Sequence, residues 1–122
     1  MYFTLKKIDN EFVFTDICSE LLELTCQNRE DLIGKTLDTA THIGDEDLRN
    51  KLRKIYILAW NQKRVLFYYF PIQNPDVFII IYLEPQHVHN EIIEIKGRCM
   101  PIFIKDLEGE LPLQHVNQFL AF

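Results

Sequence analysis

Two apolar runs in the second half of the chain constrain its fold more than any other feature. The runs "VLFYYF" at 65–70 and "VFIIIY" at 77–82 carry an apolar or aromatic residue at every position. Successive side chains of a strand point to opposite faces, so a strand that is apolar throughout must be covered on both sides. We therefore expect two buried strands, with helices of the same chain on one face and a further layer on the other.

The flanking sequence predicts three more strands. Turn signals at "QNPD" and "QHVHN" divide the second half of the chain into strands at 64–72, 77–85 and 91–104. Near the N-terminus, 2–8 and 12–16 are rich in aromatic and β-branched residues and flank "DNE", which favours a hairpin. These five strands suit one antiparallel sheet.

The segment between the two strand groups predicts helices. Apolar residues recur at helical spacing through 45–60, "DEDLRNKLRKIYILAW", and Asp45 after Gly44 is the expected N-cap. A shorter helix is expected from Ser19, capped by Asp16 or by Ser19 itself. The order of elements predicts an α+β fold, in which one longer helix and several short helices pack on one face of a five-stranded antiparallel sheet.

A very short helix is expected within "NREDLIGKTLDT" at 28–39. Asn28 can accept a backbone hydrogen bond as its N-cap, and acidic residues occupy its first turn. Gly34 is the natural stop, because a left-handed residue commonly ends a helix and glycine adopts that conformation without strain. Tertiary packing has to hold so short a helix in place.

Length, charge and cysteines exclude several classes of function. The chain has 122 residues, of which 13 are basic and 18 acidic, giving a net charge of −5 without any basic cluster. We expect a single domain that does not bind nucleic acid directly. Cys18, Cys26 and Cys99 show no metal-binding or redox spacing, which favours reduced thiols in the cytoplasm. The sequence also shows neither a signal peptide nor a membrane-spanning run.

The sequence contains no recognisable catalytic set, and we expect a protein that is not an enzyme. His42, just before the long predicted helix, is interpreted as a solvated loop residue. His87 and His89 could share a metal if the backbone between them were extended, but no third ligand is apparent. We therefore expect no catalytic residues and no metal site.

One stretch resembles a known family of sensory modules. The sequence "FTDICSELLELTCQNREDLIGKTL" at 14–37 is similar to the signature of PAS domains: a strand ending in a polar residue, a helix ending in leucine, then "eeliGk". Asp16 stands where the family often has Asn, and Cys26 where it usually has Gly. The hairpin "YLEPQHVHNEIIEIKGRCMPI" at 82–102 resembles the last hairpin of that fold. The resemblance implies a sensory domain over 1–104, followed by a linker or tail over 105–122 that could hold a short helix.

The resemblance also implies a function. PAS-like domains sense a signal, dimerise and act on an effector, here a DNA-binding, kinase or cyclic-nucleotide enzyme domain outside this chain. Photoreactive flavin members carry "NCRFL" where this chain has "LDTATHIGD" at 37–45, and haem members typically place a histidine on the long helix, where 45–60 has none. Flavin and haem are therefore disfavoured, and the cofactor stays unknown.

A cavity for a small apolar ligand is expected between the long helix and the sheet. Two alternatives remain open: a ligand-free structural interaction module, in which the same aromatic residues fill a core, and a small α+β enzyme with an apolar pocket. The candidate pocket residues are Ile33, Leu37, Leu52, Tyr56 and Trp60.

The second face of the sheet also needs a cover. It could come from the terminal segment 107–122, from a following domain, or from a second copy of the chain, and we predict a homodimer. The candidate contact residues are Phe67, Tyr69, Ile79 and Ile81, or their neighbours of opposite parity.

Overall fold

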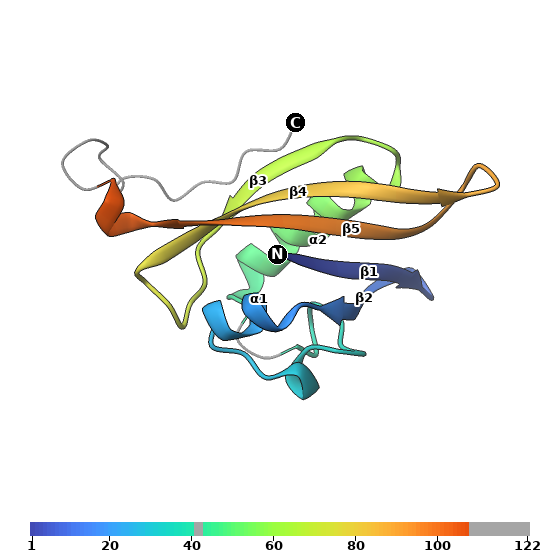
Figure 1. The fold of residues 1–122 in the computed structure, drawn as a ribbon. Helices are drawn as coiled ribbons and strands as arrows, with labels where there is room; N and C mark the ends of the chain where they lie inside the picture. Colours follow the sequence, from blue (N-terminus) through green and yellow to red (C-terminus); the bar gives the residue numbers. More distant parts are fainter. Residues whose placement is uncertain (41–42, 108–122) are drawn as a thin grey trace.

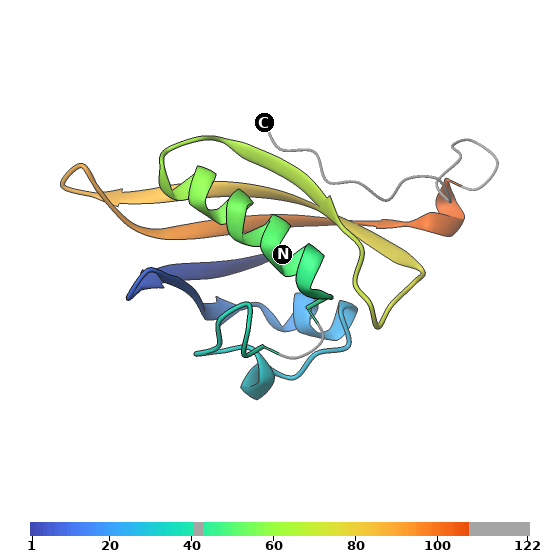
Figure 2. The same ribbon diagram turned by 180° about the vertical axis from the view of Figure 1, so that it is seen from behind.

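The computed structural model describes residues 1–40 and 43–107 and contains one five-stranded antiparallel sheet in the order β2-β1-β5-β4-β3. Helix α2 packs across β3, β4 and β5, α1 and η1 lie on the same side, and η2 lies at the end of β5 (Figures 1 and 2). The predicted fold class is confirmed. The elements are β1 Tyr2–Ile8, β2 Glu11–Ile17, α1 Ser19–Leu24, η1 Arg29–Asp31, α2 Glu46–Trp60, β3 Val65–Tyr69, β4 Val77–Val88, β5 Glu91–Phe103 and η2 Ile104–Asp106.

Two-residue turns close both long hairpins. Asp9 and Asn10 have φ of 51° and 65°, and His89 and Asn90 have φ of 51° and 68°. Positive φ at both central residues matches the right-handed twist of the strands that such a turn joins. The turn predicted over 86–90 is therefore shorter than expected, and β4 continues to Val88. β4 and β5 extend together beyond the rest of the sheet (Figure 1).

Helix α2 begins at the predicted cap. The Asp45 carboxylate accepts a hydrogen bond of 2.9 Å from the Leu48 backbone N–H. This bond satisfies one of the N–H groups that the first helical turn leaves without a partner. The buried side of the helix carries Leu52, Ile55, Tyr56 and Ala59.

Caps at the two short helices differ from prediction. Cys18 occupies the N-cap position of α1, and no side chain caps this helix, so the caps expected at Asp16 and Ser19 are wrong. Asn28 occupies the N-cap position of η1, but its side chain accepts no backbone hydrogen bond there. Its amide instead lies 3.5 Å from an Asp31 carboxylate oxygen. The helix predicted within 28–39 is only one 3₁₀ turn. The chain that follows this turn pairs with β2, and this pairing determines its path.

Gly34 forms the predicted left-handed stop, with φ of +79°. Its N–H donates to the Phe14 carbonyl at 2.8 Å, and the Phe14 N–H donates to the Lys35 carbonyl at 3.0 Å. The chain after η1 therefore runs along the free edge of β2. Backbone pairing of this kind stabilises a segment that could not stay helical alone.

Candidate ligand cavity and outer sheet face

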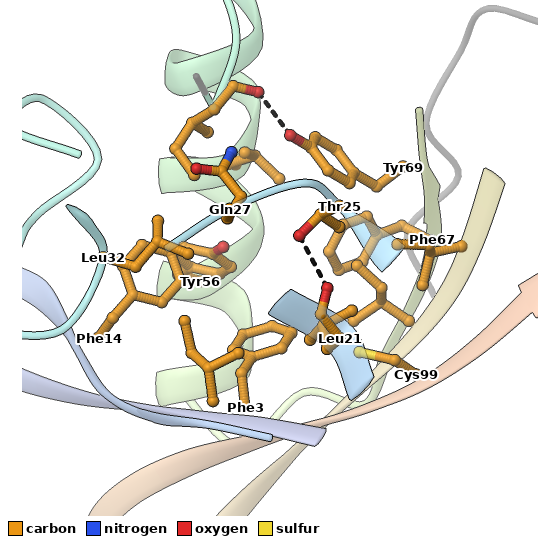
Figure 3. A pocket seen from close by; sticks show the side chains of 15 residues that line it. Phe3, Phe14, Leu21, Thr25, Gln27, Leu32, Tyr56, Phe67, Tyr69 and Cys99 are labelled. Atoms are coloured by element: carbon orange, nitrogen blue, oxygen red, sulfur yellow. Dashed lines mark hydrogen bonds between the residues drawn. The ribbon is translucent and has the colours of Figure 1, made fainter. Parts of the chain in front are cut away.

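A cavity of about 80 Å³ lies between the inner face of the sheet and the helices (Figure 3). Native interiors are close-packed and contain few voids larger than a water molecule, whereas this space exceeds the roughly 30 Å³ that one water occupies in the liquid. The walls come from β1, β2, β3, β4, β5, α1, α2 and the segments between them. The lining residues are Phe3, Phe14, Ile17, Leu21, Thr25, Gln27, Leu32, Ile43, Leu52, Tyr56, Phe67, Tyr69, Ile79, Ile81 and Cys99.

Of the five predicted pocket residues, two line this cavity and three lie elsewhere. Leu52 and Tyr56 line it, because they lie one turn apart on the buried side of α2. Trp60, one turn further along, packs edge-on against Phe12 at 6.1 Å between ring centroids. Leu37 lines a separate cavity of about 30 Å³ near the β1–β2 turn.

Ile33 packs at the border of the core, and its neighbour Leu32 is the residue that reaches the cavity. Both residues follow the 3₁₀ turn Arg29–Asp31, and the path of the chain there brings Leu32 to the cavity. The sequence had no signal for Thr25 or Gln27, which enter the lining from the chain after α1.

Besides the Gln27 amide and the Cys99 thiol, the polar side-chain groups of this mainly apolar lining are three hydroxyls. Thr25 Oγ1 donates to the Leu21 carbonyl at 2.8 Å, and Tyr69 Oη donates to the Ile43 carbonyl at 2.7 Å (Figure 3). Tyr56 is 3% exposed. Its hydroxyl makes no hydrogen bond within residues 1–40 and 43–107.

The part of the lining that the structure describes carries no charge at neutral pH. Within the described chain it contains no Asp, Glu, Lys, Arg or His. Burial raises the pKa of the Cys99 thiol to about 12 and raises the pKa of Tyr56 and Tyr69 further above their usual range. Desolvation disfavours the charged form of each group, so all three stay neutral.

The four residues that the sequence analysis gave first for the dimer contact lie on the inner face of the sheet. This part of the prediction is corrected. Phe67 is 1% exposed, and Ile79 is 1% exposed. Phe67 pairs with Ile81 and Tyr69 with Ile79, and directly opposed residues share a face of the sheet. All four line the cavity. The neighbours of opposite parity therefore face outward.

These neighbours form an outer apolar patch over β3, β4 and the end of β5. The rings of Tyr68, Phe70 and Phe78 meet with centroids 5.5 to 6.2 Å apart. Met100 is 54% exposed. Lys96 and Arg98 occupy the same face of β5 further along, so the patch has a polar border. The outer apolar patch comprises Leu66, Tyr68, Phe70, Phe78, Ile80, Tyr82, Met100 and Ile102.

Other predicted features lie away from the cavity or outside the described residues. His87 is exposed in β4 and His89 is exposed in the turn, and no group of three or more metal-binding side chains occurs among residues 1–40 and 43–107. His42 and the helix expected near the C-terminus fall in 41–42 and 108–122, outside the described chain. No helix in the described part is long and apolar enough to cross a membrane.

Comparison with known proteins returned no relative: neither the protein-family models nor the curated proteins include a match to this chain.

Proposed function

We propose that this chain is a PAS-like sensory and dimerisation domain that passes a ligand- or packing-dependent signal to an effector outside it. The supporting observation is that β3 and β4 contribute both to the cavity wall and to the outer apolar patch. β3 and β4 line the cavity with Phe67, Tyr69, Ile79 and Ile81, and carry the outer apolar patch on the alternate positions. A rearrangement around a ligand therefore acts directly on the strands that form the second surface.

Signalling by this route needs two packing states with different affinity for the ligand. Protein interiors deform little, so a change at the cavity wall moves whole side chains and the strands that carry them. Tyr69 is well placed for this, since it lines the cavity and also bonds the chain just before α2. Binding would shift the edge strand β3 against β4 and alter the patch.

The partner proposed for the outer apolar patch is a second copy of the chain. A two-fold contact brings the same patch from both copies together, and aromatic residues with Met are favoured at the centre of such contacts. The polar border given by Lys96 and Arg98 would form the rim. Residues 105–122 would lead to the effector, a DNA-binding, kinase or cyclic-nucleotide enzyme domain in a cytoplasmic regulator.

One observation favours a second function. A cavity of about 80 Å³ is small, about half of the roughly 150 Å³ in which an engineered protein binds benzene. The second function is therefore that of a purely structural interaction module, which binds no ligand and needs only the outer apolar patch.

Two measurements test these functions. Light scattering of the full chain should give a dimer, which Ile80→Glu should convert to a monomer by placing a charge in the patch. Thr4→Glu, on β1 beyond the patch, should leave the dimer intact. A wild-type monomer at high concentration would overturn dimerisation through this face. Native mass spectrometry of the purified protein separates the sensor, which should retain a small molecule, from the ligand-free module.

A further inference from the structure

The cavity lining indicates the chemistry of the ligand, on the premise that the proposed sensory function is right. No charged residue of the described chain is buried anywhere in the core, and none lines the cavity. Moving an unpaired ion from water into such a site is strongly unfavourable. The cavity therefore selects against carboxylates, phosphates and ammonium groups.

The three hydroxyl groups of the lining divide into two types. Thr25 and Tyr69 each donate their only hydroxyl proton to a backbone carbonyl, so toward the cavity they offer oxygen lone pairs. Tyr56 comes from the opposite wall, on α2, and within the described chain its hydroxyl proton has no acceptor. Among the hydroxyls of the described lining, Tyr56 is therefore the one whose proton stays available to a ligand oxygen.

We propose that the cavity binds a small neutral alcohol with a branched or cyclic apolar body, whose oxygen accepts a hydrogen bond from Tyr56. A hydroxyl can accept from one group and donate to another, so an alcohol matches both types of hydroxyl in the lining. Its body contacts Leu52, Phe67 and Ile79, which are fully apolar. The cavity volume of about 80 Å³ restricts that body to a size below benzene.

Isobutanol is the probe for this inference, and isobutyrate is its charged counterpart of similar shape. Methyl NMR titration of the full chain should show saturable binding of isobutanol, with nuclear Overhauser contacts to the methyl groups of Leu52 and Ile79. Isobutyrate should produce no such contacts. Equal binding of the two compounds, or isobutanol contacts confined to the outer apolar patch, would overturn the inference.

Tyr56→Phe tests the hydrogen bond, because it removes the hydroxyl and keeps the ring. We expect isobutanol to bind about three- to tenfold more weakly, the usual effect of losing one neutral hydrogen bond. Xenon, which needs only an apolar void, should bind the variant as it binds the wild type and so shows that the cavity is intact. Tyr2→Phe, on β1 and outside both the cavity lining and the outer apolar patch, is the matched control. Unchanged isobutanol affinity in Tyr56→Phe contradicts the assignment.

Different experimental results would contradict the proposed ligand class and the proposed sensory function. If isobutanol binds in the cavity but light scattering and effector output do not respond, the ligand class stands and the signalling proposal fails. If the natively purified protein retains a charged molecule in the cavity, the ligand class is wrong and the sensory function stands.

Discussion

Tyr69 and Ile43 are joined across one end of the cavity by a hydrogen bond of 2.7 Å from the tyrosine hydroxyl to the backbone carbonyl (Figure 3). The bond connects β3, the edge strand of the sheet, to the chain that enters α2. It is a direct link between the strand layer and the helix layer beside the proposed ligand.

Tyr69→Phe should weaken this link without changing the size of the ring. The Ile43 carbonyl loses its protein partner, so we expect the free energy of unfolding to fall by about 1 kcal/mol. Urea denaturation measures this change. Tyr82→Phe, whose ring lies on the outer face, should be close to neutral, and equal losses in the two variants would contradict a specific role for the Tyr69 bond.

Gly97→Ala should destabilise the sheet by about 1–3 kcal/mol through overpacking. Gly97 pairs with Phe3 across β5 and β1, and an added Cβ would clash with Phe3 Cε1. Phe3→Leu removes the ring, so the double variant Phe3→Leu/Gly97→Ala should lose less stability than the sum of the single variants. Strict additivity in urea denaturation would mean that the ring is not the cause.

Asp16 should make stability depend on acid pH. Hydrogen bonding from the Tyr2 hydroxyl, at 2.8 Å, is the main cause of the lowered pKa of Asp16, with smaller contributions from the Ile17 N–H and Arg29. A carboxyl whose pKa is lowered by folding stabilises the folded state above its ordinary pKa of 3.8, and this stabilisation is lost as pH falls through the lower folded value.

Asp16→Asn should therefore flatten the loss of stability below pH 3.8. Urea denaturation across the acid range measures this, and Asp9→Asn, at an exposed turn residue, is the matched control. NMR titration of the Asp16 carboxyl should give a midpoint below 3.8. A midpoint at or above that value would show that the Tyr2 bond does not hold in solution.

The three thiols should differ in reactivity toward an alkylating reagent. Cys26 is exposed, Cys18 is half-buried and Cys99 is buried. Only the thiolate reacts readily, and burial raises the pKa of Cys99 to about 12. Mass spectrometry of the native protein should find Cys26 labelled first and Cys99 labelled only after unfolding. Rapid native labelling of Cys99 in Cys26→Ser would mean that the cavity wall opens readily.

Local chemistry allowed much of the fold to be predicted from sequence. Asp45 caps α2 because its side chain reaches its own helix, and Gly34 turns left-handed because few other residues can. The apolar runs indicated strands covered on both faces, since strand periodicity is a property of neighbouring residues. These features need no knowledge of distant parts of the chain.

Distant contacts decided which residues form the candidate site. The 3₁₀ turn brings Leu32 and not Ile33 to the cavity, and its path depends on pairing between Phe14 and the residues after Gly34. Thr25 enters the lining only because α1 packs against the sheet. The local sequence predicted both Leu32 and Ile33 as inward-facing and could not choose between them, and no local pattern marks Thr25. The sequence therefore indicated a cavity but not its full membership.

One irregularity in the sheet sets which residues of β5 share a face with those of β4. Val88 pairs with Glu91 next to the turn, but the register shifts between Gln86 and His87, so that Ile80 opposes Met100. An unbroken register would have set Ile80 opposite the inward-facing Cys99, since a shift of one residue exchanges the two faces of a strand. The sequence by itself determined that both faces of these strands are apolar. Only the tertiary structure decided which face lines the cavity, because that depends on the packing of α2 and of residues near α1 against the sheet, between segments far apart in the chain.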